Sequence, residues 1–272
     1  MQILTLSDGR RLAYEMSGAG EPLLLVHGSP GDHRAWSRAI RQLPEGFLAL
    51  VPDLPGYGNS DPPPGAGMHA TVGLAEALAQ LVNSIGRPVW LAGHSYGGNV
   101  ALHLASLRPR QVRGLALIDP VFMRALSLIG QTDLLAVTEV FFTGYAAEVA
   151  AGNHAAIASM FAFWFGPGSF DTLPPTMREA LQKLAPRNAA DVQASFDDPL
   201  SAATLRSLRF PVRIFHGEHS PPVARAIATA LAQLLPDAVA DEIPGAGHGM
   251  TDTHADQVAM RISHLARPGG RA

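Results

Sequence analysis

The pentapeptide from Gly93 to Gly97 contains the side chain best placed to do chemistry. It reads Gly-His-Ser-Tyr-Gly, follows a short apolar run from Val89, and precedes apolar residues at helical spacing. In this strand–turn–helix setting a sharp turn presents the serine hydroxyl at the carboxyl edge of a sheet, beside a helix N-terminus. The flanking glycines let the strand and the helix approach closely. We predict Ser95 as a nucleophile; the alternative is a glycine-rich turn whose serine is inert.

A serine hydroxyl is a weak nucleophile unless a neighbouring base accepts its proton during attack. The chain has 11 histidines, and His248 stands in the run Pro-Gly-Ala-Gly-His-Gly that begins at Pro244. The glycines around it permit a tight backbone path that could bring the imidazole towards Ser95. We predict His248 as the base. The chain has no cysteine, which excludes thiol nucleophiles, disulfides and thiolate metal sites.

These residues must be positioned by alternating strands and helices. Alternating or continuous apolar runs predict strands, and amphipathic spacing predicts helices. The expected strands are 2–6, 11–17, 22–27, 47–52, 89–94, 111–118, 210–217 and 238–243, and the expected helices are 71–85, 222–235 and 252–265, with another beginning near Asp32. Strands alternating with helices imply a mainly parallel sheet.

The alternation of strands and helices stops after Pro120, and helical patterns continue to about residue 205 without a convincing strand. We therefore expect an α/β core domain formed by residues 1–120 and 206–272. Residues 121–205, called the cap below, are expected to form a helical insertion. Residues 267–272 are expected to fray.

Composition excludes several classes of function. Of 272 residues 47% are hydrophobic and 16% charged, and the net charge of −3 gives no basic footprint for nucleic acid. The N-terminus has no apolar run of signal-peptide length, and no segment offers about 18 uninterrupted apolar residues. We expect a cytoplasmic protein without a membrane span or a nucleic-acid partner. The sequence leaves homo-oligomerisation open.

Four motifs together resemble the α/β-hydrolase fold family, over nearly the whole chain outside residues 120–205. They are His-Gly-Ser-Pro-Gly at 27–31, Asp-Leu-Pro-Gly-Tyr-Gly-Asn-Ser at 53–60, the elbow at Ser95, and Gly-Ala-Gly-His at 245–248. The resemblance implies an α/β fold with a mostly parallel central sheet flanked by helices and a helical cap inserted after strand 6. It implies a serine hydrolase that needs no cofactor and no metal.

The resemblance also implies the remaining catalytic groups. The backbone N–H groups of Ser29 and Tyr96 occupy the positions of the family's oxyanion hole. The family's acid usually stands in Gly-Glu-x-Asp after the seventh strand, but here that run is Gly-Glu-His-Ser, with Ser220 where the carboxylate is expected. Some members carry the acid at the end of the sixth strand, where this chain has Asp119. We predict Asp119 as the acid that orients His248, with Glu218 as the alternative.

The expected substrate is a moderately apolar carboxylic ester, thioester or lactone, cleaved through an acyl-enzyme. Relatives that dehalogenate haloalkanes or open epoxides place aspartate at the elbow, whereas this chain has Ser95. The cap is rich in bulky apolar side chains, which could form a chamber over the serine, although aromatic residues at helical spacing also pack as core. The predicted pocket residues are Phe122, Phe141, Phe142, Phe161 and Trp164.

Three other functions use the same scaffold. An acyltransferase or perhydrolase would share the acyl-enzyme, and a tailoring enzyme would carry out cyclisation or elimination on a bound intermediate. A non-catalytic ligand-binding protein is favoured only by the serine at position 220. Retained ligand binding without turnover would identify the binding protein.

Overall fold

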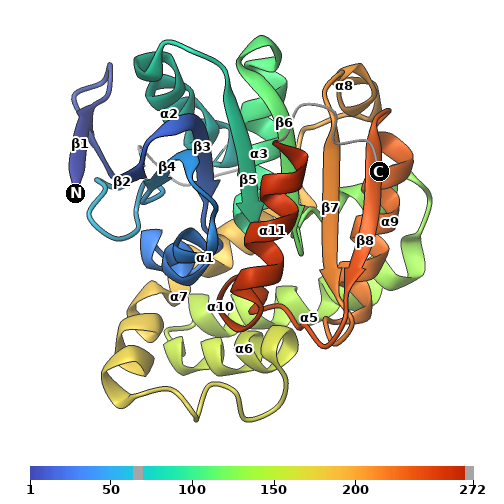
Figure 1. The fold of residues 1–272 in the computed structure, drawn as a ribbon. Coiled ribbons are helices and arrows are strands. Elements are labelled where there is room, and N and C mark those ends of the chain that lie inside the picture. Colours follow the sequence, from blue (N-terminus) through green and yellow to red (C-terminus); the bar gives the residue numbers. More distant parts are fainter. Residues whose placement is uncertain (64–69, 267–272) are drawn as a thin grey trace.

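An eight-stranded sheet forms the centre of the molecule (Figure 1). The computed structural model describes residues 1–63 and 70–266, so the expected fraying of 267–272 lies outside the described residues. The strand order is β1-β2-β4-β3-β5-β6-β7-β8. The strands are β1 (Gln2–Thr5), β2 (Arg11–Gly18), β3 (Gly20–Val26), β4 (Gly46–Pro52), β5 (Val89–His94), β6 (Val112–Ile118), β7 (Val212–Gly217) and β8 (Ala238–Ile243).

Strands β3 to β8 run parallel, while β1 pairs antiparallel with β2 and β2 pairs antiparallel with β4. The central strands are mostly apolar and buried, as expected for strands whose two faces are both covered by helices. Side chains of β3 alternate between these faces: Leu23 and Leu25 join one hydrophobic cluster, and Leu24 and Val26 join the other. The predicted mostly parallel sheet is confirmed.

Helices α1 (Ser37–Gln42), α10 (Met250–Thr253) and α11 (Ala255–Leu265) cover one face of the sheet (Figure 1). Helices α2 (Ala70–Ile85), α3 (Tyr96–Leu107) and α9 (Pro222–Leu234) cover the other. The helix expected near Asp32 starts as a 3-10 turn over His33–Trp36, which the Asp32 side chain caps by accepting from the Arg34 amide.

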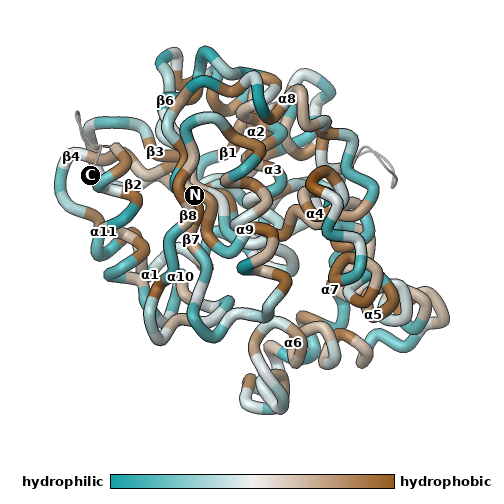
Figure 2. The backbone as a smooth tube through the Cα atoms, turned by 90° about the vertical axis from the view of Figure 1, so that its right-hand side faces the viewer, coloured by the Kyte–Doolittle hydropathy of each residue, from teal (hydrophilic) through white to brown (hydrophobic). Residues whose placement is uncertain are grey.

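Residues 119–211, all of which the structure describes, form helices and no strand. They comprise α4 (Arg124–Leu128), α5 (Thr132–Ala150), α6 (Ile157–Phe165), α7 (Pro175–Phe196) and α8 (Ala202–Ser207). Helices α5, α6 and α7 lie together at the carboxyl ends of the parallel strands (Figure 1), and Figure 2 shows them on one side of the core with hydrophobic stretches. Helix α7 contacts α2 and α3 of the core. The cap's status as a separate domain stays a prediction.

No helix within residues 1–63 and 70–266 combines the length and the hydropathy that crossing a membrane requires.

Candidate active site

Ser95 lies in the turn between β5 and α3, with φ +56° and ψ −128°. This conformation costs a non-glycine residue about 1–3 kcal/mol. Two hydrogen bonds hold the turn in place: the Ser95 amide donates to the Ile118 carbonyl over 3.0 Å, and the Val121 amide donates to the Ser95 carbonyl over 3.0 Å. The turn is therefore fixed against β6 and the segment that follows it.

Close backbone approach explains the glycines around Ser95. A Cβ on Gly97 would lie 2.3 Å from the His27 carbonyl oxygen, and one on Gly93 would lie 2.4 Å from the Gly97 carbonyl oxygen. A Cβ on Gly28 would lie 2.8 Å from the Cβ of Ser95. Strand β5, helix α3 and the loop after β3 can meet at the serine only because these positions lack side chains.

The structure brings Ser95, His248 and Asp119 into one chain of hydrogen bonds. His248 Nε2 lies 3.0 Å from Ser95 Oγ, and His248 Nδ1 lies 2.8 Å from Asp119 Oδ2. A carboxylate only accepts, so Nδ1 carries the hydrogen and Nε2 is free to accept from the serine hydroxyl. The three residues are only 6%, 3% and 0% exposed, respectively. This arrangement can move a proton from Ser95 to His248.

Asp119, and not Glu218, hydrogen-bonds His248. Asp119 directly follows β6 and has φ +45°, which turns its side chain out of the strand direction. The Ser220 hydroxyl donates to Asp119 Oδ2 over 2.7 Å. Glu218 is exposed and accepts from the Gly245 amide over 2.8 Å. The sequence did not predict this hydrogen bond from Ser220 to Asp119. The signal for it was the position of Ser220 in Gly-Glu-His-Ser, where the family's acid usually stands.

The backbone segments that carry the two predicted oxyanion donors meet at Ser95. Tyr96 is the first residue of α3, so its N–H belongs to the helix N-terminal amides that lack an intrahelical acceptor. Ser29 follows Gly28, which packs directly against Ser95. Both amides therefore belong to segments at the nucleophile.

The His27 ring holds the loop that carries Ser29 in place through two hydrogen bonds. Its Nε2 accepts from the Leu54 amide over 2.9 Å, so the hydrogen is on Nδ1, which donates to the Gly28 carbonyl over 2.8 Å. Burial lowers the pKa of His27, which favours the neutral ring that this pair of contacts requires. His27 therefore supports the loop, and its two ring nitrogens are occupied.

Aromatic residues of the cap lie against the imidazole of His248. Trp164 stacks on His248 with ring centroids 4.4 Å apart, and Phe165 meets it at an angle of 68° with centroids 5.4 Å apart. Phe122 and Phe142 are fully buried, and the half-buried Phe141 packs on Phe142. Of the predicted pocket residues, Trp164 is thus the one in ring contact with the site. 

One further aromatic contact bears on the pocket prediction. Half-buried Phe161 packs on Phe165, a residue that was not among the predicted pocket residues.

His94 Nε2 lies 2.8 Å from the His248 carbonyl oxygen and donates to it. Burial, with the nearby His248, lowers the pKa of His94 to about 3. A neutral His94 therefore holds the backbone of His248 in place.

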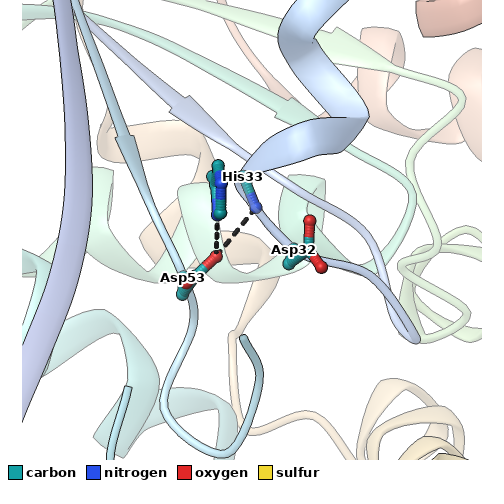
Figure 3. Close-up of side chains that lie close together, drawn as sticks. All are labelled: Asp32, His33 and Asp53. Atoms are coloured by element: carbon teal, nitrogen blue, oxygen red, sulfur yellow. Dashed lines mark hydrogen bonds and ion pairs between the residues drawn. The ribbon is translucent and has the colours of Figure 1, made fainter. Parts of the chain in front are cut away.

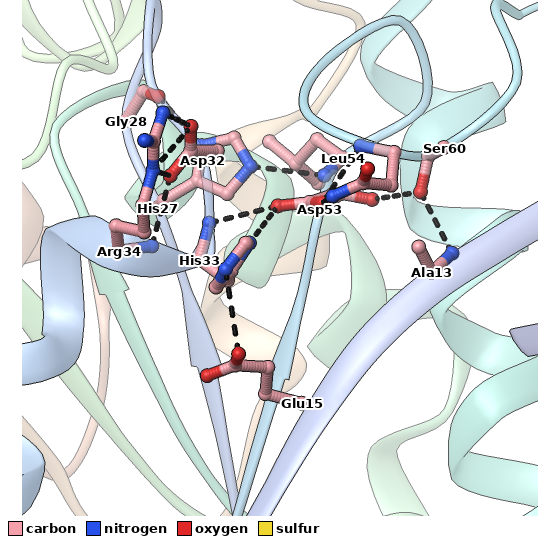
Figure 4. Close-up of polar contacts among 11 residues, drawn as sticks. Ala13, Glu15, His27, Gly28, Asp32, His33, Arg34, Asp53, Leu54 and Ser60 are labelled. Atoms are coloured by element: carbon pink, nitrogen blue, oxygen red, sulfur yellow. Dashed lines mark hydrogen bonds and ion pairs between the residues drawn. The ribbon is translucent and has the colours of Figure 1, made fainter. Parts of the chain in front are cut away.

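Asp32, His33 and Asp53 form a cluster whose possible ligand atoms all lie within 4.8 Å of one another (Figure 3). Asp53 Oδ1 accepts from the amide of His33 over 2.8 Å and pairs with its Nδ1 over 2.7 Å, and Oδ2 accepts from the Asn59 amide over 2.8 Å. The Asp32 carboxylate pairs with Arg34 (Figure 4). Because these oxygens already have donors, we interpret the cluster as a structural link between the two loops and not as a metal centre.

Replacing Asp53 by Asn is expected to destabilise the fold in a pH-dependent way. Burial alone would raise the pKa of Asp53, but hydrogen bonds from His33 and Asn59 outweigh it and lower the pKa. The stabilisation is therefore present above the unfolded-state pKa of about 3.9 and is lost as pH falls through the lower folded-state pKa. We expect a loss of roughly 1–3 kcal/mol at neutral pH, measured by urea unfolding, that shrinks in acid.

Asp8→Asn is the matched control, because Asp8 pairs with Arg10 at the surface and such pairs contribute about 0–1 kcal/mol. A difference between wild type and Asp53→Asn that grows as the pH falls would contradict this account of Asp53.

Comparison with known proteins shows the family of the chain. A profile of the alpha/beta hydrolase family matches residues 23–261, and the chain belongs to that family. It is 43% identical over 108 residues to Lipase LipV of Mycobacterium tuberculosis and 36% identical over 120 residues to Lipase 1 of Psychrobacter immobilis. These alignments cover 39% and 43% of this chain, and 40% and 37% of the two relatives, so the chain matches only about two fifths of their length.

A solved structure is similar along the whole chain. It is a thermophilic esterase from Thermogutta terrifontis, which has 26% sequence identity and a TM-score of 0.71, with 98% of each chain covered. The fold of the core and the placement of helices between β6 and β7 are thus those of an α/β hydrolase.

Proposed function

We propose that this protein is a serine hydrolase that cleaves moderately apolar carboxylic esters through an acyl-enzyme. The observation that carries the proposal is the buried hydrogen-bond chain from Ser95 through His248 to Asp119. A serine hydroxyl beside a neutral imidazole suits attack on an acyl carbonyl and leaves an ester intermediate on the enzyme. The similarity to lipases and an esterase supports an ester substrate.

In the proposed reaction Ser95 Oγ attacks the carbonyl carbon while its proton passes to His248 Nε2. Asp119 holds the imidazole in position and stabilises the imidazolium that forms. The tetrahedral oxyanion accepts hydrogen bonds from the Ser29 and Tyr96 amides, each contributing roughly 10²–10³-fold to the rate. Collapse expels the alcohol, which takes the proton from His248. A water molecule then cleaves the acyl-enzyme by the same steps, releasing the acid and regenerating Ser95.

The surroundings of the imidazole favour an apolar substrate. Trp164 and Phe165 form an apolar wall against His248 and limit water at the base. Thioesters and lactones undergo the same acyl chemistry and belong to the proposed substrate class. Transfer of the acyl group to an acceptor other than water would use the same intermediate.

Hydrolysis of p-nitrophenyl acetate, butyrate and octanoate tests the proposal. We expect release of p-nitrophenolate and free acid, with kcat/KM rising from acetate to butyrate because each buried methylene contributes about 0.8 kcal/mol. Binding of these esters by folded protein without turnover would instead identify a ligand-binding protein. Acyl products formed only when an alcohol acceptor is added would identify a transferase.

A further inference from the structure

A chain of polar side chains runs from the half-buried Ser29, in the loop after β3, into the buried interior of the cap. Ser29 Oγ lies 2.6 Å from the Tyr57 hydroxyl, and that hydroxyl donates to Asp191 Oδ2 over 2.5 Å. The Asn188 side-chain amide donates to Ser29 Oγ over 3.1 Å. Tyr57 belongs to the loop after β4, while Asn188 and Asp191 belong to α7. Three segments far apart in sequence therefore converge on the hydroxyl of Ser29.

The direction of each hydrogen bond follows from Asp191. Its carboxylate is fully buried and 3.0 Å from the guanidinium of Arg187. Burial raises the pKa of Asp191, and the contacts with Arg187 and Tyr57 oppose this rise. The Tyr57 hydroxyl donates to Asp191, so the Tyr57 oxygen must accept from Ser29, while Asn188 donates to Ser29. The Ser29 hydroxyl is thereby held on both its donor and its acceptor side.

Stability alone is a weak explanation for this arrangement. Replacing a buried ion pair by well-packed apolar residues is often neutral or stabilising. Asn188 and Asp191 are three positions apart and so share one face of α7, and both are buried. From that face Asn188 bonds Ser29 directly, and Asp191 reaches it through the Tyr57 hydroxyl. The backbone of Ser29 follows Gly28, which packs against Ser95.

We infer that Tyr57, Asp191 and Asn188 are positioning residues for the oxyanion hole. By fixing the Ser29 side chain they hold the N–H of the same residue in the orientation that the tetrahedral oxyanion needs. The cap thus completes the catalytic machinery of the core without touching the reacting atoms. This inference rests on the proposed function, since it assumes that the Ser29 amide stabilises an oxyanion.

The test compares Tyr57→Phe and Ser29→Ala with wild type. Each substitution removes one hydroxyl of the network and keeps the Ser29 amide. We expect kcat for p-nitrophenyl butyrate to fall about 10-fold with little change in KM, less than the 10²–10³-fold cost of losing a donor outright. The Kd of phenylboronic acid, whose tetrahedral adduct on Ser95 places an oxygen in the oxyanion hole, should rise by the same factor. The double variant should lose no more than either single variant, because both cut one chain.

Asp198→Asn is the matched control. Asp198 is also a buried carboxylate, but it bonds His103 of α3 and the Leu200 amide, away from Ser29. We expect it to lower the melting temperature and to leave kcat and the boronic acid Kd within about two-fold of wild type. Equal losses of kcat in Asp198→Asn and Tyr57→Phe would show a general loss of integrity and overturn the inference.

Two other outcomes separate the inference from the proposed function. Tyr57→Phe and Ser29→Ala with wild-type kcat and boronic acid affinity, in an enzyme that hydrolyses the ester, would overturn the positioning network alone. A wild-type protein that neither hydrolyses the ester nor binds the boronic acid would overturn the proposed function and the network with it. If Tyr57→Phe fails to fold, Ser29→Ala alone tests the inference, because it removes the hydroxyl that the network holds and keeps the Ser29 amide.

Discussion

Asp119→Asn is expected to lower kcat about 10⁴-fold, because an amide in place of the acid fails to hold His248 in the tautomer that accepts from Ser95. Asp119 is fully buried, and its Oδ2 accepts from both His248 and Ser220. Steady-state hydrolysis of p-nitrophenyl butyrate measures the loss, and circular dichroism checks that the variant is folded.

Glu218→Gln is the matched comparison, since it makes the same acid-to-amide change at the other candidate. Glu218 is exposed and bonds the Gly245 amide, so its substitution is expected to leave kcat within about two-fold of wild type. A larger loss in Glu218→Gln than in Asp119→Asn would move the catalytic acid to the segment after β7.

Ser95→Ala is expected to abolish nearly all ester hydrolysis, with a loss on the order of 10⁶-fold in kcat. The substitution removes the only atom proposed to form the acyl-enzyme, so the rapid first release of p-nitrophenolate should disappear as well. His248 and the oxyanion amides remain, and the residual rate would come from them and from binding. Stopped-flow mixing with p-nitrophenyl acetate measures both phases.

Ser220→Ala serves as the control for Ser95→Ala, because it removes a serine hydroxyl that donates to Asp119 and is not the proposed nucleophile. Ser220→Ala should keep the rapid first release of p-nitrophenolate (the burst), since Asp119 can still accept from His248. A burst that survives in Ser95→Ala would show that another residue forms the covalent intermediate.

The elements around the nucleophile were predictable because their signals are local. The apolar run of β5, the glycines at 93 and 97 and the helical spacing of α3 lie within a few residues of Ser95. These local signals predict the turn, and the close approach of β5 to α3 at Gly93 and Gly97 is the one expected from the sequence. The approach of Gly97 to the His27 carbonyl was not predicted.

The sequence favoured Asp119 over Glu218 as the acid but did not exclude Glu218. Asp119 and Glu218 stand at the carboxyl ends of the adjacent parallel strands β6 and β7, so both reach the same edge of the sheet. The structure separates them: Asp119 Oδ2 accepts from His248 and Ser220, whereas Glu218 accepts from the Gly245 amide. The contacts of Asp119 join residues more than 100 positions apart, so a local pattern does not predict them.

The sequence could not predict which cap residues contact the site, because these contacts join positions far apart in the chain. Tyr57 and Asp191 are 134 positions apart, and no periodicity links them. In the cap, aromatic residues at helical spacing have the same pattern whether they pack as core or face a site. Phe142 is fully buried, whereas Trp164 also stacks on His248.

Labelling with a fluorophosphonate probe, followed by mass spectrometry of the modified peptide, tests the central claim most directly. Phosphonylation requires a serine activated by its base and a tetrahedral adduct stabilised by oxyanion donors. We predict rapid modification confined to Ser95, absent in Ser95→Ala and strongly slowed in His248→Ala. Folded wild-type protein that remains unlabelled, or that is labelled at another residue, would contradict the assignment of Ser95 as the catalytic nucleophile.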